Sequence, residues 1–353
     1  MGIGMRRSPR FRVPVPVLCS VFVFSQLTCA VPRAYADTPP TRWDIAKDPG
    51  ARARWDLHVR VRQMLLLRGQ LDTESMRDAA LERARALLEE ARAATSPDVR
   101  LRFDLGEVYY ALDRYERAVA VLVPALEMAP EHPGAVDALA YLAYAYAKLD
   151  KSSAERATYE KYLARVNDDR SRATAMLNLA EAEMRLGNMS DAIAGYKETI
   201  ALCESLPSGV SQAHTLILAV WGLAVALDRD GQAREGLAAA RRAVMMDPDD
   251  RAIAHDPNVF FVPQYDRYWY LAMGATVRAE DAKAADEAAR AWKKVEETWT
   301  KYIDPADAHD RWTAIAKARR DRAKAQRLAA EARVPTTKAP KGAKPPPLPP
   351  PQP

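Results

Sequence analysis

The sequence predicts an all-α protein built as a solenoid of stacked antiparallel helix pairs. The main observation is that a Leu followed by a small residue recurs five times, at steps of 37, 37, 44 and 48 residues. Repetition at this period is typical of helical repeats, each of which leaves an apolar face for its neighbour to cover. The recurring pairs are Leu105-Gly106, Leu142-Ala143, Leu179-Ala180, Leu223-Ala224 and Leu271-Ala272.

Residues 1–36 have the features of a secretory signal peptide. Four arginines precede an apolar run over 13–24, and Ala34-Tyr35-Ala36 provides a small-x-small cleavage site. The run is too short to span a membrane, which takes about 20 apolar residues. We therefore expect cleavage after Ala36 and export to the periplasm or envelope of a Gram-negative bacterium. An uncleaved anchor and lipid attachment at Cys29 are the weaker alternatives.

Charge is distributed unevenly along the chain. Residues 1–36 contain five Arg and no acidic residue, which accounts for the whole formal net charge of +5. Residues 311–353 carry a net charge of +9, and residues 37–310 carry −9. A near-neutral mature chain is not the pattern of a nucleic-acid binder, so no nucleic-acid partner is expected. The basic end either meets an anionic surface or folds back on the acidic body.

Cysteine usage predicts a core that holds without disulfides. Cys203 is the only cysteine after residue 36, so an internal disulfide cannot form in the mature chain. We expect Cys203 to be buried on a helix, because a free cysteine behaves as a small hydrophobic residue.

Residues 37–96 are expected to form an exposed lead and a capping helix pair. Two helices, near 50–68 and 73–94, are separated by a break at Arg68-Gly69, and each has apolar residues on one face. The pair has the size of a repeat but lacks its marker residues, as terminal repeats often do.

Residues 97–303 resemble the tetratricopeptide repeat family over about five units. The first unit matches the order and spacing of that family at Leu105, Gly106, Tyr109, Ala118, Leu122, Ala125 and Pro130. Gly106 and Ala118 would let the two helices approach closely, and Pro130 cannot continue a helix. The third unit departs from the family at Glu183, and the fifth lacks a glycine in its turn. The resemblance implies a right-handed superhelix whose concave groove is lined by the first helix of each pair.

Insertions interrupt the repeats near 203–215 and 249–266. The second contains an apolar segment with Phe260 and Phe261, bracketed by Pro257 and Pro263. Two interpretations remain open. The phenylalanines either pack into the seam between repeats, or they form an exposed contact patch or a lid over the groove.

The C-terminal region is expected to be a basic helix over 304–333, beginning near Ala306 and mostly solvated. The Lys/Pro-rich tail over 334–353 is expected to be disordered or polyproline II.

No catalytic or metal-binding motif is present in the sequence, so we expect neither enzymatic activity, nor a metal, nor a cofactor. The densest cluster of acidic and imidazole groups, Asp304, Asp307, His309 and Asp310, is interpreted as a helix start.

The expected function is a protein-interaction scaffold that holds a protein or peptide in the groove. Aromatic and Arg side chains on the first helices are the expected anchors. The proposed groove residues are Phe103, Glu107, Tyr110, Tyr141, Tyr144, Lys148, Asn178, Glu181, Arg185 and Trp221. The Lys/Asn clamp that some family members use for acidic peptide ends is not found. The alternative function is an envelope adaptor whose basic C-terminal segment docks on anionic cell wall or lipid.

Overall fold

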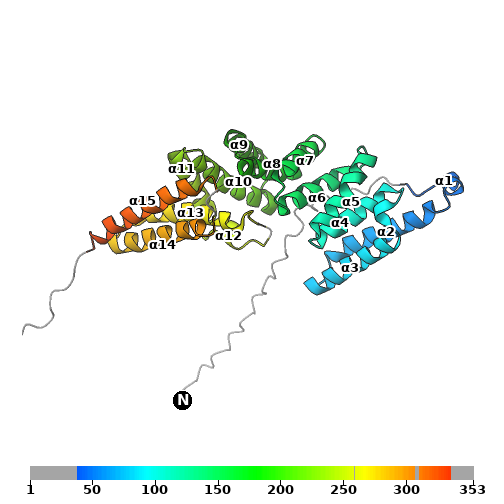
Figure 1. The fold of residues 1–353 in the computed structure, drawn as a ribbon, viewed down its shortest axis with the longest axis horizontal. Coiled ribbons are helices and arrows are strands. Elements are labelled where there is room, and N and C mark those ends of the chain that lie inside the picture. Colours follow the sequence, from blue (N-terminus) through cyan, green and yellow to red (C-terminus); the bar gives the residue numbers. More distant parts are fainter. Residues whose placement is uncertain (1–37, 258, 307–309, 335–353) are drawn as a thin grey trace, which may run out of the picture.

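The computed structural model describes residues 38–257, 259–306 and 310–334. All regular elements in these residues are helical, and helices that follow one another in the chain pack together. The result is the predicted right-handed α-solenoid (Figure 1). The predicted signal peptide and the tail beyond Val334 lie outside the described residues.

The helices form successive antiparallel pairs. An N-terminal pair, α2/α3, precedes five repeat pairs, which are α4/α5, α6/α7, α8/α9, α10/α11 and α13/α14, and α15 packs on the last of them. The α-helices are α1 (Arg42–Lys47), α2 (Ala51–Arg68), α3 (Glu74–Glu90), α4 (Val99–Ala111), α5 (Tyr115–Met128), α6 (Ala135–Lys148), α7 (Ser152–Leu163), α8 (Asp169–Leu186), α9 (Met189–Ser205), α10 (Val210–Arg229), α11 (Ala233–Met246), α12 (Arg251–Ala254), α13 (Arg267–Asp281), α14 (Ala285–Ile303) and α15 (Thr313–Glu331). Two 3-10 turns, η1 (Ala93–Thr95) and η2 (Gln264–Asp266), complete the set.

The turn inside each of the first four repeats has the same backbone design. A residue with positive φ follows the first helix, and the next N–H donates to a carbonyl five residues earlier in the chain, as in a Schellman cap. The positive-φ residues are Asp113, Asp150, Gly187 and Gly231. The fifth repeat, whose turn lacks a glycine, has no such residue, and α13 ends at Asp281.

Gly106 provides the close approach that the sequence predicts in the first repeat. A Cβ atom at this position would overlap the Leu122 side chain, which is fully buried. The small residue therefore sets how near α4 and α5 can lie to each other.

The core divides into three clusters along the solenoid. One joins α2 to α6, a small one joins α6 to α8, and a large one extends from α8 to α15. Cys203 is buried on α9, as predicted. By length and composition, α10 is the one described helix that could cross a membrane. It is half buried and packs against α8, α9, α11 and α13, so we interpret it as a core helix.

The basic C-terminal helix differs from its prediction in where it begins and in what it contacts. It begins at Thr313 and not near Ala306, after Asp310 accepts a hydrogen bond from the Trp312 N–H at 2.8 Å. It packs along α14 through Ala316, Ala323 and Ala330, which are buried. The helix is mostly solvated, as expected, since 11 of its 19 residues are exposed, and small alanines rather than large apolar residues form its contact face.

Arginines of α15 pair with the acidic body. Arg319 donates to Asp228 at 2.6 Å, and Arg327 donates to Glu296 at 2.9 Å. This part of the basic segment therefore folds back on the protein, which was one of the two predicted outcomes.

Candidate functional site

A groove of about 560 Å³ extends along several consecutive helix pairs of the solenoid. Its walls come mainly from the first helices α4, α6, α8 and α10 and from the loop after α12. Residues of α2, α3, α5, α7, α9, α12 and α13 complete the lining. It extends over the small core cluster that joins α6 to α8. All five repeats and the N-terminal pair therefore contribute to one continuous surface.

Tyrosines form the wall of the groove on α4 and α6. The Tyr110 ring lies 5.0 Å from the Tyr141 ring and 5.2 Å from the Tyr144 ring, in tilted and edge-on arrangements. Tyr115, at the start of α5, extends the cluster with its ring 6.3 Å from that of Tyr144. The wall is assembled because Tyr141, Tyr144 and Lys148 lie three and four residues apart and so share one face of α6.

The loop after α12 closes one side of the groove. The Phe260 ring lies 5.3 Å from the Tyr144 ring, and Lys148 Nζ lies 3.6 Å from the Phe260 centroid. The neighbouring Phe261 packs against Tyr270 at 5.2 Å and joins the large core cluster. The two predicted interpretations thus divide between the residues: Phe261 packs into the seam, and Phe260 reaches across the groove.

Charged and hydrogen-bonding groups form the floor. Arg185 donates to Glu155, and both side chains are buried. Asn178 donates to the Tyr159 hydroxyl at 2.9 Å. Glu181 also lines the floor, and burial raises the pKa of its carboxyl above the usual range, opposed by Arg185. Burial likewise lowers the pKa of Lys148.

Eight of the ten predicted groove residues line this groove. They are Glu107, Tyr110, Tyr141, Tyr144, Lys148, Asn178, Glu181 and Arg185. The placement of Trp221 is wrong, because it has no exposed surface and packs where α10 meets Gly274 of α13. The placement of Phe103 is also wrong. Its side chain is buried and lines a separate, smaller pocket beside His132.

Sequence reasoning missed several groove residues on the second helices. Tyr159 and Tyr196 lie on second helices, which were not predicted to line the groove, yet both line the floor. Gly222, on the first helix α10, also lines the groove, and the Tyr196 ring occupies the space where its Cβ atom would lie. This glycine is a signal that could have indicated the close contact of Tyr196 with α10.

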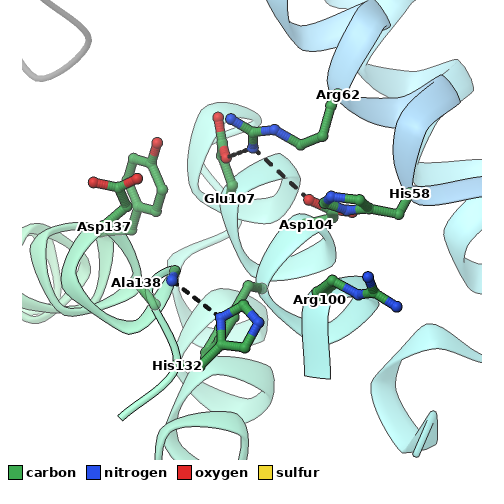
Figure 2. Close-up of a pocket in the computed structure, with 11 residues that line it drawn as sticks. His58, Arg62, Arg100, Asp104, Glu107, His132, Asp137 and Ala138 are labelled. Atoms are coloured by element: carbon green, nitrogen blue, oxygen red, sulfur yellow. Dashed lines mark hydrogen bonds and ion pairs between the residues drawn. The ribbon is translucent and has the colours of Figure 1, made fainter. Parts of the chain in front are cut away.

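The smaller pocket lies between α2, α4 and the start of α6 (Figure 2). His58 Nδ1 lies 2.6 Å from Asp104 Oδ2, and both residues are buried. Arg62 donates to Glu107 and lies 3.7 Å from Asp104. Burial raises the pKa of Asp104, opposed by its hydrogen bond with His58.

This pocket has the size of a structural water site. Its space of about 10 Å³ is close to the minimum that holds one water molecule. We therefore interpret His58, Asp104 and Arg62 as a polar tie that fixes the N-terminal pair to the first repeat. Among the described residues, no group of three or more His, Cys, Asp or Glu is placed to hold a metal ion.

The fold and the groove together define a helical-repeat protein of the interaction-scaffold class. Two family models described as tetratricopeptide repeat match residues 76–140 and 156–207. These matches identify tetratricopeptide repeats in the chain, and proteins with such repeats are generally non-catalytic scaffolds. The first match begins within α3, which shows that the repeat pattern extends into the N-terminal pair.

Three solved structures illustrate the likeness. MamA AMB-1 is 21% identical and has a TM-score of 0.41, over 48% of this chain and 91% of that one. YrrB, described as a TPR protein with an unusual peptide-binding site, is 16% identical with a TM-score of 0.38, over 66% and 97%. A Rap protein complexed with competence and sporulation factor is 13% identical with a TM-score of 0.41, over 84% and 83%. No curated protein matches this chain.

Proposed function

We propose that this protein is a non-catalytic scaffold whose groove holds an extended segment of a partner protein. The observation that carries the proposal is the groove itself, about 560 Å³ in volume and lined by residues of all five repeats. Its tyrosines offer large, rigid contact surfaces with polar tips, the side chains on which interface energy concentrates. A segment that enters beside Tyr144 would also contact Phe260, which makes the loop after α12 part of the contact surface.

We also infer that the scaffold works in the cell envelope after export. This part rests on the charge pattern and cleavage site of residues 1–36. The alternative function, an adaptor with a basic docking segment, has less support. Arg319 and Arg327 pair with acidic residues of the body, so their charges are not available to an anionic surface. Lys338, Lys341 and Lys344 remain as basic residues of the tail.

Site-specific photocrosslinking tests the groove assignment. A photoreactive phenylalanine derivative replaces Tyr144 in the groove, and in a matched variant it replaces Met245. Met245 is a well-exposed residue of α11, a second helix. Both proteins are expressed with their native leader and irradiated in cells, and the adducts are identified by mass spectrometry.

We expect a defined adduct from position 144 that is absent at position 245. Adducts only at position 245, or none at position 144 while folding is intact by circular dichroism, would contradict the groove assignment.

A further inference from the structure

Among the charged groups around Glu181, which include Arg229 and Asp266 behind the groove lining, carboxylates outnumber guanidinium groups by one. Arg185 is engaged by Glu155, and Arg229 donates to Asp266 at 2.8 Å. Glu181 interacts electrostatically with Arg185, Arg229 and Asp266, but it has no hydrogen bond or ion pair with any residue that the structure describes. A negative charge therefore remains uncompensated in the floor.

The Glu181 carboxylate is placed where a ligand can reach it. The residue is partly buried and lines the groove, and burial raises the pKa of its carboxyl. Such an environment disfavours the ionised form until a cation arrives. A positively charged group in the groove would restore the ionised form and gain a charge-assisted hydrogen bond.

The charged residues that line the groove also have a net negative charge. Acidic residues outnumber basic ones, with seven Asp or Glu against three Lys or Arg. The acidic residues are Glu74, Asp78, Glu107, Asp113, Glu155, Glu181 and Asp256, and the basic ones are Arg68, Lys148 and Arg185. A partner of opposite charge is favoured, because complementary potentials steer its approach and penalise acidic competitors.

Aromatic rings in the groove add to a binding site for a cation. Tyr110 and Tyr144 line the same groove as Glu181 and are partly exposed, whereas Tyr196 and Tyr270 are almost fully buried in its wall. A carboxylate beside aromatic rings suits an ammonium or guanidinium group, which the ring faces attract. The groove already contains one such contact, since Lys148 lies over the Phe260 ring.

We propose that the groove selects an extended protein segment bearing a lysine or arginine, whose charged group pairs with Glu181. This inference rests on the proposed function, because it assigns a chemistry to the segment that the groove holds. The proposed charge preference is opposite to that of the Lys/Asn clamp, which binds acidic peptide ends and whose pattern the sequence lacks.

Peptide display on the full chain tests the proposal. A library of random peptides is selected against the native protein, and against a Tyr144→Ala/Lys148→Ala variant to remove peptides that bind elsewhere. Affinities of the selected peptides are then measured for Glu181→Gln and for the matched control Glu198→Gln. Glu198 is an exposed residue of α9 outside the groove.

We expect the selected peptides to be enriched in Lys and Arg. Glu181→Gln should weaken them about tenfold or more, the scale of a hydrogen bond to a charged group, and Glu198→Gln should change affinity less than twofold. A peptide in which the critical Lys or Arg is replaced by Gln should lose no further affinity on Glu181→Gln, because the two changes remove the same contact. This cycle separates a direct pairing from a folding defect, which circular dichroism also checks.

Groove-dependent peptides without basic residues, or full affinity in Glu181→Gln, would overturn the inference and leave the proposed function standing. Peptides that all ignore the Tyr144→Ala/Lys148→Ala change would overturn both.

Discussion

The acidic residues Asp104 and Glu181 have surroundings that differ sharply. Asp104 lies 2.6 Å from His58 and 3.7 Å from Arg62, beside a space of about 10 Å³. Glu181 faces a groove of about 560 Å³ and has no hydrogen-bond or ion-pair partner among the described residues. Burial raises the pKa of both.

A raised pKa alone therefore does not distinguish an acidic residue with a structural role from one that binds a ligand. The pairing of the carboxylate and the space beside it do distinguish the two. A paired acid in a pocket that holds one water molecule has neither a free hydrogen-bond acceptor nor room for a ligand. An unpaired acid in an open groove has both. The two sites should therefore respond oppositely to removal of the charge.

The largest effect is expected at the polar tie. Asp104→Ala leaves His58 and Arg62 in a site from which their partner is missing, and breaking a buried pair costs about 3–5 kcal/mol. Urea unfolding should show this loss, and amide hydrogen exchange should place it in α2 and α4. Glu116→Ala, at an exposed position of α5, is the control and should be nearly neutral. A loss below about 1 kcal/mol would mean that the tie is not structural.

A second, smaller effect tests whether the packing of α4 on α5 affects stability without affecting peptide binding at the groove. Gly106→Ala places a methyl group against Leu122, and overpacking of this kind costs about 1–3 kcal/mol. The double variant with Leu122→Val should lose less than the sum of the two single changes, because the smaller side chain makes room. Peptide affinity at the groove should be unchanged in the folded protein. Strictly additive losses would show that the contact does not limit the approach of α4 to α5.

Much of the fold was predictable because the repeat markers act locally. The recurring Leu-small pairs and the turn glycines constrain neighbouring helices directly, and the positive-φ residues Asp113, Asp150, Gly187 and Gly231 all follow their Leu by the same distance. The extent of the α15 contact was not predicted because its alanines give no strong apolar signal, although seven-residue spacing places them on one face.

The groove was predictable in outline but not in its chemistry. The helical period indicates which residues share a face, but it does not show which face a neighbouring repeat covers, so Trp221 and Phe103 were misplaced. The spacing of Glu181 and Arg185 suggests a pair on one helix. The structure shows Arg185 engaged by Glu155 of α7 instead, a contact between helices that no single-helix pattern contains.

The smallest predicted effect is also the one that distinguishes the two acids best. Glu181→Gln should raise the free energy of unfolding at neutral pH by roughly 1 kcal/mol, the low end of the cost of leaving a buried polar group unpaired. The sign follows from the raised pKa. Below 4.5, the ordinary value for glutamate, the carboxyl is protonated in both the folded and the unfolded chain, so the substitution changes little.

As pH rises, the unfolded chain ionises first and the wild type alone loses stability, until the folded carboxyl ionises too. Urea unfolding of both proteins across this range should therefore show curves that coincide in acid and separate toward neutral pH. A destabilising Glu181→Gln at neutral pH would mean that the carboxylate has a partner in the folded protein, and Glu181 would then belong with Asp104 as a structural acid. A stabilised variant that has also lost its peptides would show that the groove keeps an unfavourable charge for binding.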